Sequence, residues 1–86
     1  MYSIYWSKLS KITFEDETNF IIEKWNEDEG EKFGSLVNST LISLAFQPEM
    51  GLFKRDMKVY SLVISKQTTL FYRIIEKELI IELLLF

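Results

Sequence analysis

The sequence predicts an α+β fold in which an N-terminal strand and a two-helix hairpin pack on an antiparallel, curved sheet of three to four strands. Apolar residues recur at helical spacing as far as Phe46, whereas from Val59 onward they recur with a period of two. The chain has 86 residues, 48% apolar and 27% charged, which suits one folded domain. We therefore expect a single domain over residues 1–86.

The first strand is expected from Tyr2 to Trp6, where aromatic and β-branched residues gather. Ser7 or Ser10 can then cap a helix, because a serine oxygen accepts hydrogen bonds from free amides of the first turn. That helix is expected to run to about Asn26, with its apolar face formed by Phe14, Thr18, Ile21, Ile22 and Trp25. The polar run from Asn26 to Gly30 is expected to connect it to the next helix.

The second helix has the most regular pattern in the chain. Its apolar positions are Phe33, Leu36, Val37, Leu41, Leu44 and Ala45, which share one helical face. The helix is expected to end near Phe46, because Pro48 cannot continue it and Gly51 favours a turn towards the sheet.

Two β-hairpins are expected after Val59. In the second, a two-residue loop at Lys77-Glu78 places Arg73 opposite Glu82, and this opposite-charge pair favours that register. The residues then assigned to the helix side are Tyr72, Ile74, Leu79, Ile81 and Leu83. Those on the other side are Phe71, Arg73, Ile75, Ile80 and Glu82. In the first hairpin, a three-residue loop at Lys66-Gln67-Thr68 is preferred because it keeps Leu62 and Ile64 on the helix side.

The composition excludes several kinds of site. The chain has no cysteine and no histidine, so disulfides, Cys/His zinc sites and Cys or His catalysis are excluded, and we expect neither a metal nor a cofactor. Residues 1–47 carry eight acidic and four basic residues, and residues 48–86 carry five acidic and six basic ones. Because only Lys54, Arg55 and Lys58 form a basic cluster, a broad nucleic-acid-binding surface is not expected.

The N-terminal residues do not resemble a signal peptide. They lack a basic segment followed by an apolar one, and no apolar stretch of the chain is long enough to span a membrane. We expect a cytoplasmic protein without a membrane partner.

An ordered set of segments resembles a known family. The segments are the first strand ending in Trp6-Ser7, a helical hairpin with Trp25 at its bend, the Leu-x-x-x-Pro-x-x-Gly pattern from Leu44 to Gly51, and Ile64-Ser65-Lys66 followed by Leu70-Phe71-Tyr72-Arg73-Ile74. Together they resemble the RelE/ParE superfamily, the small toxins of bacterial type II toxin-antitoxin modules, also described as plasmid-stabilisation proteins. The resemblance implies a toxin that a cognate antitoxin wraps and neutralises. It also implies either inhibition of DNA gyrase, as in ParE-like members, or cleavage of mRNA on the ribosome, as in RelE-like members.

The resemblance and the charge pattern suggest candidate site residues. Arg73 and Lys58 are the candidate catalytic residues, since basic groups stabilise the charge of a phosphoryl transition state. Lys54, Arg55 and Lys66 are the candidate residues for binding phosphate or the target. The alternatives are a solvated loop for the first basic cluster, a structural pair with Glu82 for Arg73 and a solvated turn for Lys66.

The final strand is the candidate surface for a protein partner. Its residues are Leu83, Leu84, Leu85 and Phe86. An apolar outer face and an uncovered strand favour either pairing with a partner segment or self-association. The expected partners are therefore a cognate antitoxin and a second copy of the chain, beside gyrase or the ribosome as the target.

Two departures from the family leave its activity open. Related sequences commonly carry an arginine in the strand before the Ser-Lys turn, where this chain has Tyr60 and Ser61. Many also continue into an aromatic-acidic-arginine tail, which is not found up to Phe86. Whether the chain is an enzyme stays open, and an inactive homologue that only binds antitoxins is the alternative interpretation.

Overall fold

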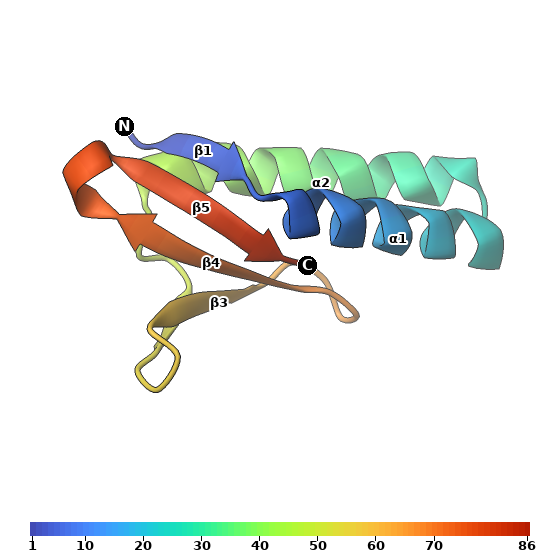
Figure 1. Cartoon of the computed structure of the whole chain (residues 1–86). Coiled ribbons are helices and arrows are strands. Elements are labelled where there is room, and N and C mark those ends of the chain that lie inside the picture. The colour runs from blue at the N-terminus through green and yellow to red at the C-terminus, as the bar shows by residue number, and fades with distance from the viewer.

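The computed structural model describes residues 1–86 and has the predicted α+β fold (Figure 1). The elements in chain order are β1 (Ser3–Trp6), α1 (Lys8–Lys24), α2 (Glu27–Phe46), β2 (Leu52–Lys54), β3 (Val59–Val63), β4 (Thr69–Ile75), a 3-10 turn (Glu76–Glu78) and β5 (Ile80–Leu85). The two helices form an antiparallel hairpin beside a twisted sheet.

The sheet has five strands in the order β1-β5-β4-β3-β2. Neighbouring strands from β2 to β5 are antiparallel, but β1 pairs with β5 in parallel, with Ser3 beside Ile80 and Trp6 beside Leu83. The sheet is therefore mixed rather than antiparallel, and it has five strands where three to four were predicted. Two parts of this architecture were not predicted, namely the short strand β2 and the pairing of the first strand with the last.

Side-chain caps fix where both helices begin. The Ser7 oxygen accepts a hydrogen bond from the Ser10 amide at 3.1 Å, which confirms Ser7 as the cap of α1. The Asn26 side chain accepts from the Glu29 amide at 2.9 Å and caps α2, whose first turn is acidic as the helix dipole favours. The prediction of a connecting loop from Asn26 to Gly30 is therefore wrong, because α2 already begins at Glu27.

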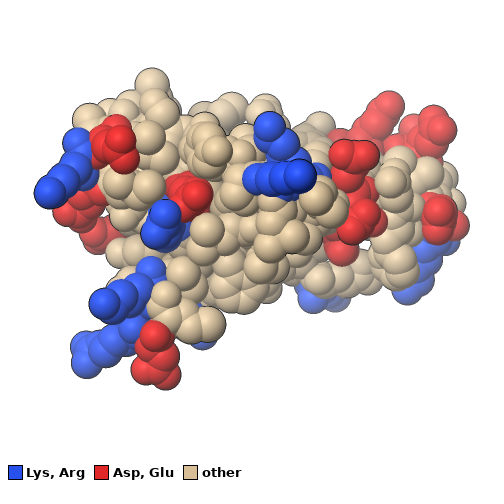
Figure 2. Space-filling view, in the orientation of Figure 1, with Lys and Arg blue, Asp and Glu red and all other residues tan.

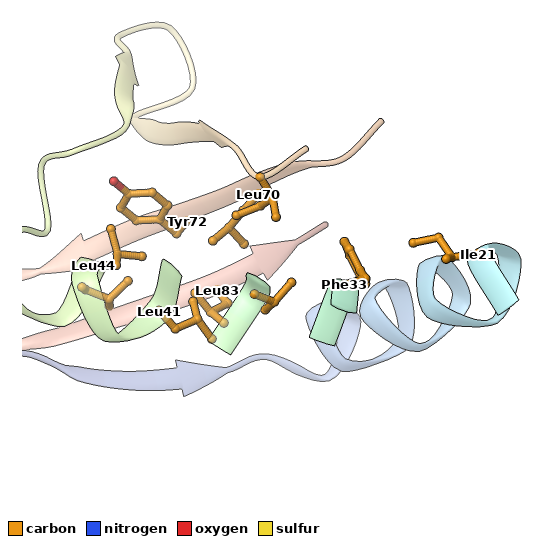
Figure 3. Close-up of a cluster of buried hydrophobic side chains, with 10 residues drawn as sticks. Ile21, Phe33, Leu41, Leu44, Leu70, Tyr72 and Leu83 are labelled. Atoms are coloured by element: carbon orange, nitrogen blue, oxygen red, sulfur yellow. The ribbon is translucent and has the colours of Figure 1, made fainter. Parts of the chain in front are cut away.

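The hydrophobic core lies between the helices and one face of the sheet (Figure 3). Most residues predicted for the inner face of α2 are buried: Phe33, Val37, Leu41, Leu44 and Ala45. They meet Leu70, Tyr72, Ile81 and Leu83 from β4 and β5, which are completely buried. Leu36 and Trp25, which were predicted to lie on the apolar faces of the two helices, are exposed instead.

The registers of the hairpins position the rest of the sheet. Arg73 lies opposite Glu82, as predicted, although the connection covers residues 76–79 and Leu79 is exposed in a left-handed conformation. In the first hairpin Leu62 lies opposite Leu70, and the connection covers residues 64–68 rather than three residues. This register differs from the predicted one by an even number of residues, so Leu62 still lies on the helix side.

Candidate functional site

One face of the sheet is covered by the helices and the other is open. Tyr72, Ile81 and Leu83 point into the core, so their neighbours along the strands point outward. The outward set is the predicted one on β4 and β5: Phe71, Arg73, Ile75, Ile80 and Glu82. We call this surface the open sheet face.

An apolar pocket of about 280 Å³ lies on this face. It is lined only by hydrophobic residues: Met57, Val59, Phe71, Leu84 and Leu85. A break in register beside Phe71 brings it opposite Leu85, while Tyr72 lies opposite Leu83, so β5 has one extra residue there. Leu84 and Leu85 thus both reach the pocket, whereas strict alternation would place them on opposite faces.

The predicted basic cluster lies in the tight connection between β2 and β3. Lys54 ends β2 and lies opposite Val59, and its carbonyl accepts a hydrogen bond from the Lys58 amide at 2.8 Å. Arg55 and Lys58 are exposed in the loop between these strands. Figure 2 shows basic side chains gathered at the end of the sheet where this loop projects. The structure therefore brings Lys54, Arg55 and Lys58 together beside the apolar pocket, with Asp56 as the one acidic residue of the loop.

Arg73 is not a free charge on the open sheet face. Its Nε donates a hydrogen bond to a carboxylate oxygen of Glu82, the residue directly opposite on β5. The two side chains are 55% and 19% exposed. The structural pairing that the sequence suggested is present, and Glu82 compensates the positive charge that a catalytic arginine would supply.

The two tyrosines of β3 and β4 belong to the packing rather than to the open face. Tyr60 stacks on Tyr72 with ring centroids 5.2 Å apart. Burial raises the pKa of the Tyr72 phenol, although the hydrogen bond from the Gly51 amide opposes this. Burial also raises the pKa of Tyr60, with help from the negative charges of Glu49 and Glu76. Because a free phenol already ionises near pH 10, neither tyrosine is suited to act as a base at neutral pH.

Lys66 is separated from the other basic candidates. It lies in the exposed connection between β3 and β4, beside a second pocket of about 310 Å³ whose apolar wall comes from Ile21, Trp25, Phe33 and Leu36. Its position fits the solvated turn that was the alternative interpretation. Of the two catalytic candidates, Arg73 forms a salt bridge and Lys58 forms none.

The predicted partner surface on the last strand needs correction at two residues. Leu83 is completely buried, so it cannot form part of a docking surface. Phe86 stacks on Trp6 with ring centroids 5.4 Å apart and lies 5.5 Å from Phe14, so it closes the end of the core. Leu84 and Leu85 remain on the open sheet face. Moreover, β5 lies between β1 and β4, so no partner strand can pair with it.

The sequence interpretation missed the lining residues Met57 and Val59. The period-two pattern places Val59 on the outer face together with Ser61, and this was the available signal. Met57 carried no such signal, because its position depends on how β2 and β3 turn. No group of three or more acidic residues is arranged to hold a metal ion. Neither helix is both long and apolar enough to cross a membrane.

The open sheet face thus combines an apolar pocket with the basic residues of the loop between β2 and β3. No protein-family model matches the chain, and no curated protein matches it. The RelE/ParE resemblance therefore remains a prediction from the sequence.

Proposed function

We propose that this protein is the toxin component of a type II toxin-antitoxin module of the RelE/ParE type, bound and neutralised by a cognate antitoxin in the cytoplasm. The observation that supports the proposal is the element order, a strand and a helical hairpin followed by an antiparallel meander with one open face. The apolar pocket on that face gives a protein partner a place to anchor apolar side chains.

The side chains favour growth inhibition by binding, as in ParE-like inhibitors of DNA gyrase, over RNA cleavage. Arg73 is paired with Glu82, and Tyr72 faces the core with a raised pKa. Lys54, Arg55 and Lys58 remain to contact the target, and their positive charges, of which those of Arg55 and Lys58 are exposed, attract an anionic or acidic surface.

The mode of action can be tested by inducing the protein in growing bacteria. We expect growth arrest with altered plasmid supercoiling, and no new mRNA ends in primer-extension mapping. Reversing the rim charges in Lys54→Glu/Arg55→Glu/Lys58→Glu should relieve the arrest. The matched control is Lys8→Glu/Lys11→Glu, which reverses exposed charges on α1 away from the sheet rim. New ribosome-dependent mRNA ends would support the RelE-like activity and contradict the gyrase proposal.

The antitoxin part of the proposal has its own test. The protein is co-expressed with the product of the neighbouring upstream gene and purified through one partner. We expect a stable complex that Met57→Asp weakens, because Met57 is exposed and lines the pocket. Absence of any complex, with both proteins folded, would count against a toxin-antitoxin module.

The second candidate function is a non-toxic homologue that only binds antitoxins. Tyr60 and Ser61 favour it, because they stand where related sequences commonly carry an arginine. Harmless overexpression together with retained antitoxin binding would select this function.

A further inference from the structure

The outward face of α1 carries exposed apolar residues that do not pack in the hydrophobic core. Leu9, Ile12 and Phe20 are 51%, 46% and 50% exposed. Together with the exposed Asp16 and Glu23 they recur every three or four residues, and they therefore lie on one side of the helix. We call Leu9, Ile12, Asp16, Phe20 and Glu23 the α1 stripe. It is separate from the buried side of α1, which carries Ser10 and Ile21.

The open sheet face is complementary to the α1 stripe, because it is apolar with basic residues where the stripe is apolar with acidic ones. Its centre is the apolar pocket that Phe71, Leu84 and Leu85 help to line, and its rim carries Lys54 and Lys58. A sheet that is apolar on both faces is normally covered by a second layer, and helices are a common cover. Here one face has its helices and the other has none.

The end of β5, which borders the open sheet face, lies close to α1. The Phe86 amide at the end of β5 donates a hydrogen bond to the Thr13 hydroxyl of α1 at 2.9 Å, so this strand end lies beside the first turns of the helix. In the view of Figure 2, acidic side chains are numerous on the helical part, with some basic ones among them, and the projecting loop at the sheet end carries basic side chains with an acidic one beside them.

We propose that a second copy of the chain covers the open sheet face, with the α1 stripe of each copy lying on the sheet of the other in a two-fold symmetric dimer. A two-fold axis makes the same contact twice, so every stripe and every pocket is used. The acidic residues Asp16 and Glu23 then approach Lys54 and Lys58 of the other copy. The alternative of sheet against sheet would bring the two basic rims together, which like-charge repulsion disfavours.

The area of the proposed contact can be estimated from the size of the helix. A 17-residue helix is about 25 Å long, and a helix covers a strip about 10 Å wide. Two such contacts hide on the order of 1,000 Å² in total, counting both partners, which is near the lower limit for a specific interface. The dimer is therefore weak and sensitive to salt, because its charged rim is exposed. It does not depend on the proposed function, although it would compete with any partner that binds the open sheet face.

Sedimentation velocity of the full chain tests the proposal over about 5 to 500 μM, a range suited to a weak interface. At about 25 mM salt we expect a monomer-dimer equilibrium, and at about 500 mM salt a dissociation constant at least about tenfold higher. A monomer throughout the range at low salt would overturn the proposal.

Charge reversal identifies which surfaces meet. Asp16→Lys/Glu23→Lys makes the stripe basic, and Lys54→Glu/Lys58→Glu makes the rim acidic, so each variant alone should be monomeric. An equimolar mixture should restore the dimer, because each stripe then meets a rim of opposite charge. The matched control Glu27→Lys/Glu31→Lys reverses exposed acids on α2 and should leave the dimer intact. A dimer that survives both reversals, or a mixture that stays monomeric, would contradict the proposed contact.

A neutral substitution tests the apolar part. Phe20→Ser removes an exposed aromatic ring of the stripe and should raise the dissociation constant about tenfold while circular dichroism stays unchanged. Ile42→Ser is the control, since Ile42 is exposed to a similar degree but lies on α2. Equal effects of both substitutions would place the interface elsewhere. The antitoxin pull-down can succeed or fail independently of these results.

Discussion

Tyr72 links the centre of the sheet to the turn that follows α2. Its ring is completely buried, and its hydroxyl donates a hydrogen bond to the Pro48 carbonyl at 2.7 Å. The same oxygen accepts one from the Gly51 amide at 3.0 Å. Backbone groups of a turn would otherwise need water, so one phenol satisfies two polar groups close to the core.

Tyr72→Phe should lower the free energy of unfolding by about 1–3 kcal/mol at pH 8, because both hydrogen bonds are lost and two backbone groups lose their partner. The substitution should also make stability less sensitive to alkaline pH. Above the ordinary tyrosine pKa of about 10, the unfolded phenol loses its proton while the buried one, whose pKa is raised, keeps it. The unfolded state then binds fewer protons, so stability falls as pH rises.

Urea unfolding at pH 8 and at about pH 11 measures both effects. The substitution should reduce the loss of stability between these two pH values, and the Tyr60 phenol accounts for part of what remains. The exposed Tyr5, changed to Phe, is the control. An equal alkaline loss in the wild type and in Tyr72→Phe would refute the assignment.

The Arg73-Glu82 ion pair should contribute little to stability. Arg73→Ala should change the free energy of unfolding by less than about 1 kcal/mol, because the arginine is largely exposed and solvent screens the pair. A double-mutant cycle with Glu82→Ala measures the coupling. If Arg73 served catalysis, Arg73→Ala would abolish growth inhibition; we expect the inhibition to persist.

At the scale of elements, the two helices pack tightly against each other at Gly30. An added Cβ at Gly30 would lie 2.6 Å from the Ile22 Cγ1 atom, whereas at Gly34 it would meet nothing within 4 Å. Both glycines lie inside α2. Because only Gly30 is close to a neighbouring side chain, the same substitution should have opposite effects on stability at the two positions.

Gly30→Ala should lower the free energy of unfolding by about 1–3 kcal/mol, because α1 and α2 must move apart or Ile22 must leave its place. Gly34→Ala should raise it by up to about 1 kcal/mol, since alanine favours a helix more than glycine does. Chemical unfolding of both variants checks the contrast. A stabilising Gly30→Ala would show that the hairpin is not tightly packed there.

The elements show what local sequence patterns can predict. The periodicity of α2 and the charge pair in the second hairpin gave a correct helix and a correct register. The segment from Asn26 to Gly30 failed, because its polar composition is equally suited to a capped, acidic first helical turn. Strand β2 was missed because three residues carry no measurable period, and pairing with β3 rather than propensity makes them a strand.

At the scale of the whole molecule, the end of β5 packs against the segment that joins β1 to α1. Phe86 packs on Trp6 and Phe14, and its amide is bound by Thr13. This cluster closes the core where β1 passes into α1, which explains why a residue predicted to bind a partner is structural instead.

Phe86→Ala should therefore lower the free energy of unfolding by about 1–3 kcal/mol, less than for a fully buried ring, because Phe86 is only partly buried. Thermal unfolding followed by tryptophan fluorescence measures the change. Phe46→Ala is the control, since Phe46 is exposed and its loss should be nearly neutral. Equal losses in the two variants would mean that the end cluster adds no stability.

The candidate site was predictable only in part, because some of its features form only when separate strands come together. The basic residues could be selected from their clustering in the sequence, and the outward residues of β4 and β5 from alternation. The pocket depends on an irregular register beside Phe71 and on a turn that brings Met57 over the sheet. Neither the irregular register nor the turn follows from a local sequence pattern, so neither could be predicted from the sequence.

The position of β5 has a consequence for how the protein is made. This strand is translated after every other strand, yet it lies inside the sheet and joins β1 to β4. Until it leaves the ribosome, β1 has no strand to pair with and the inner faces of α2 and β4 lack Ile81 and Leu83. The nascent chain must therefore stay incompletely folded, with apolar surface exposed, until the last strand is released.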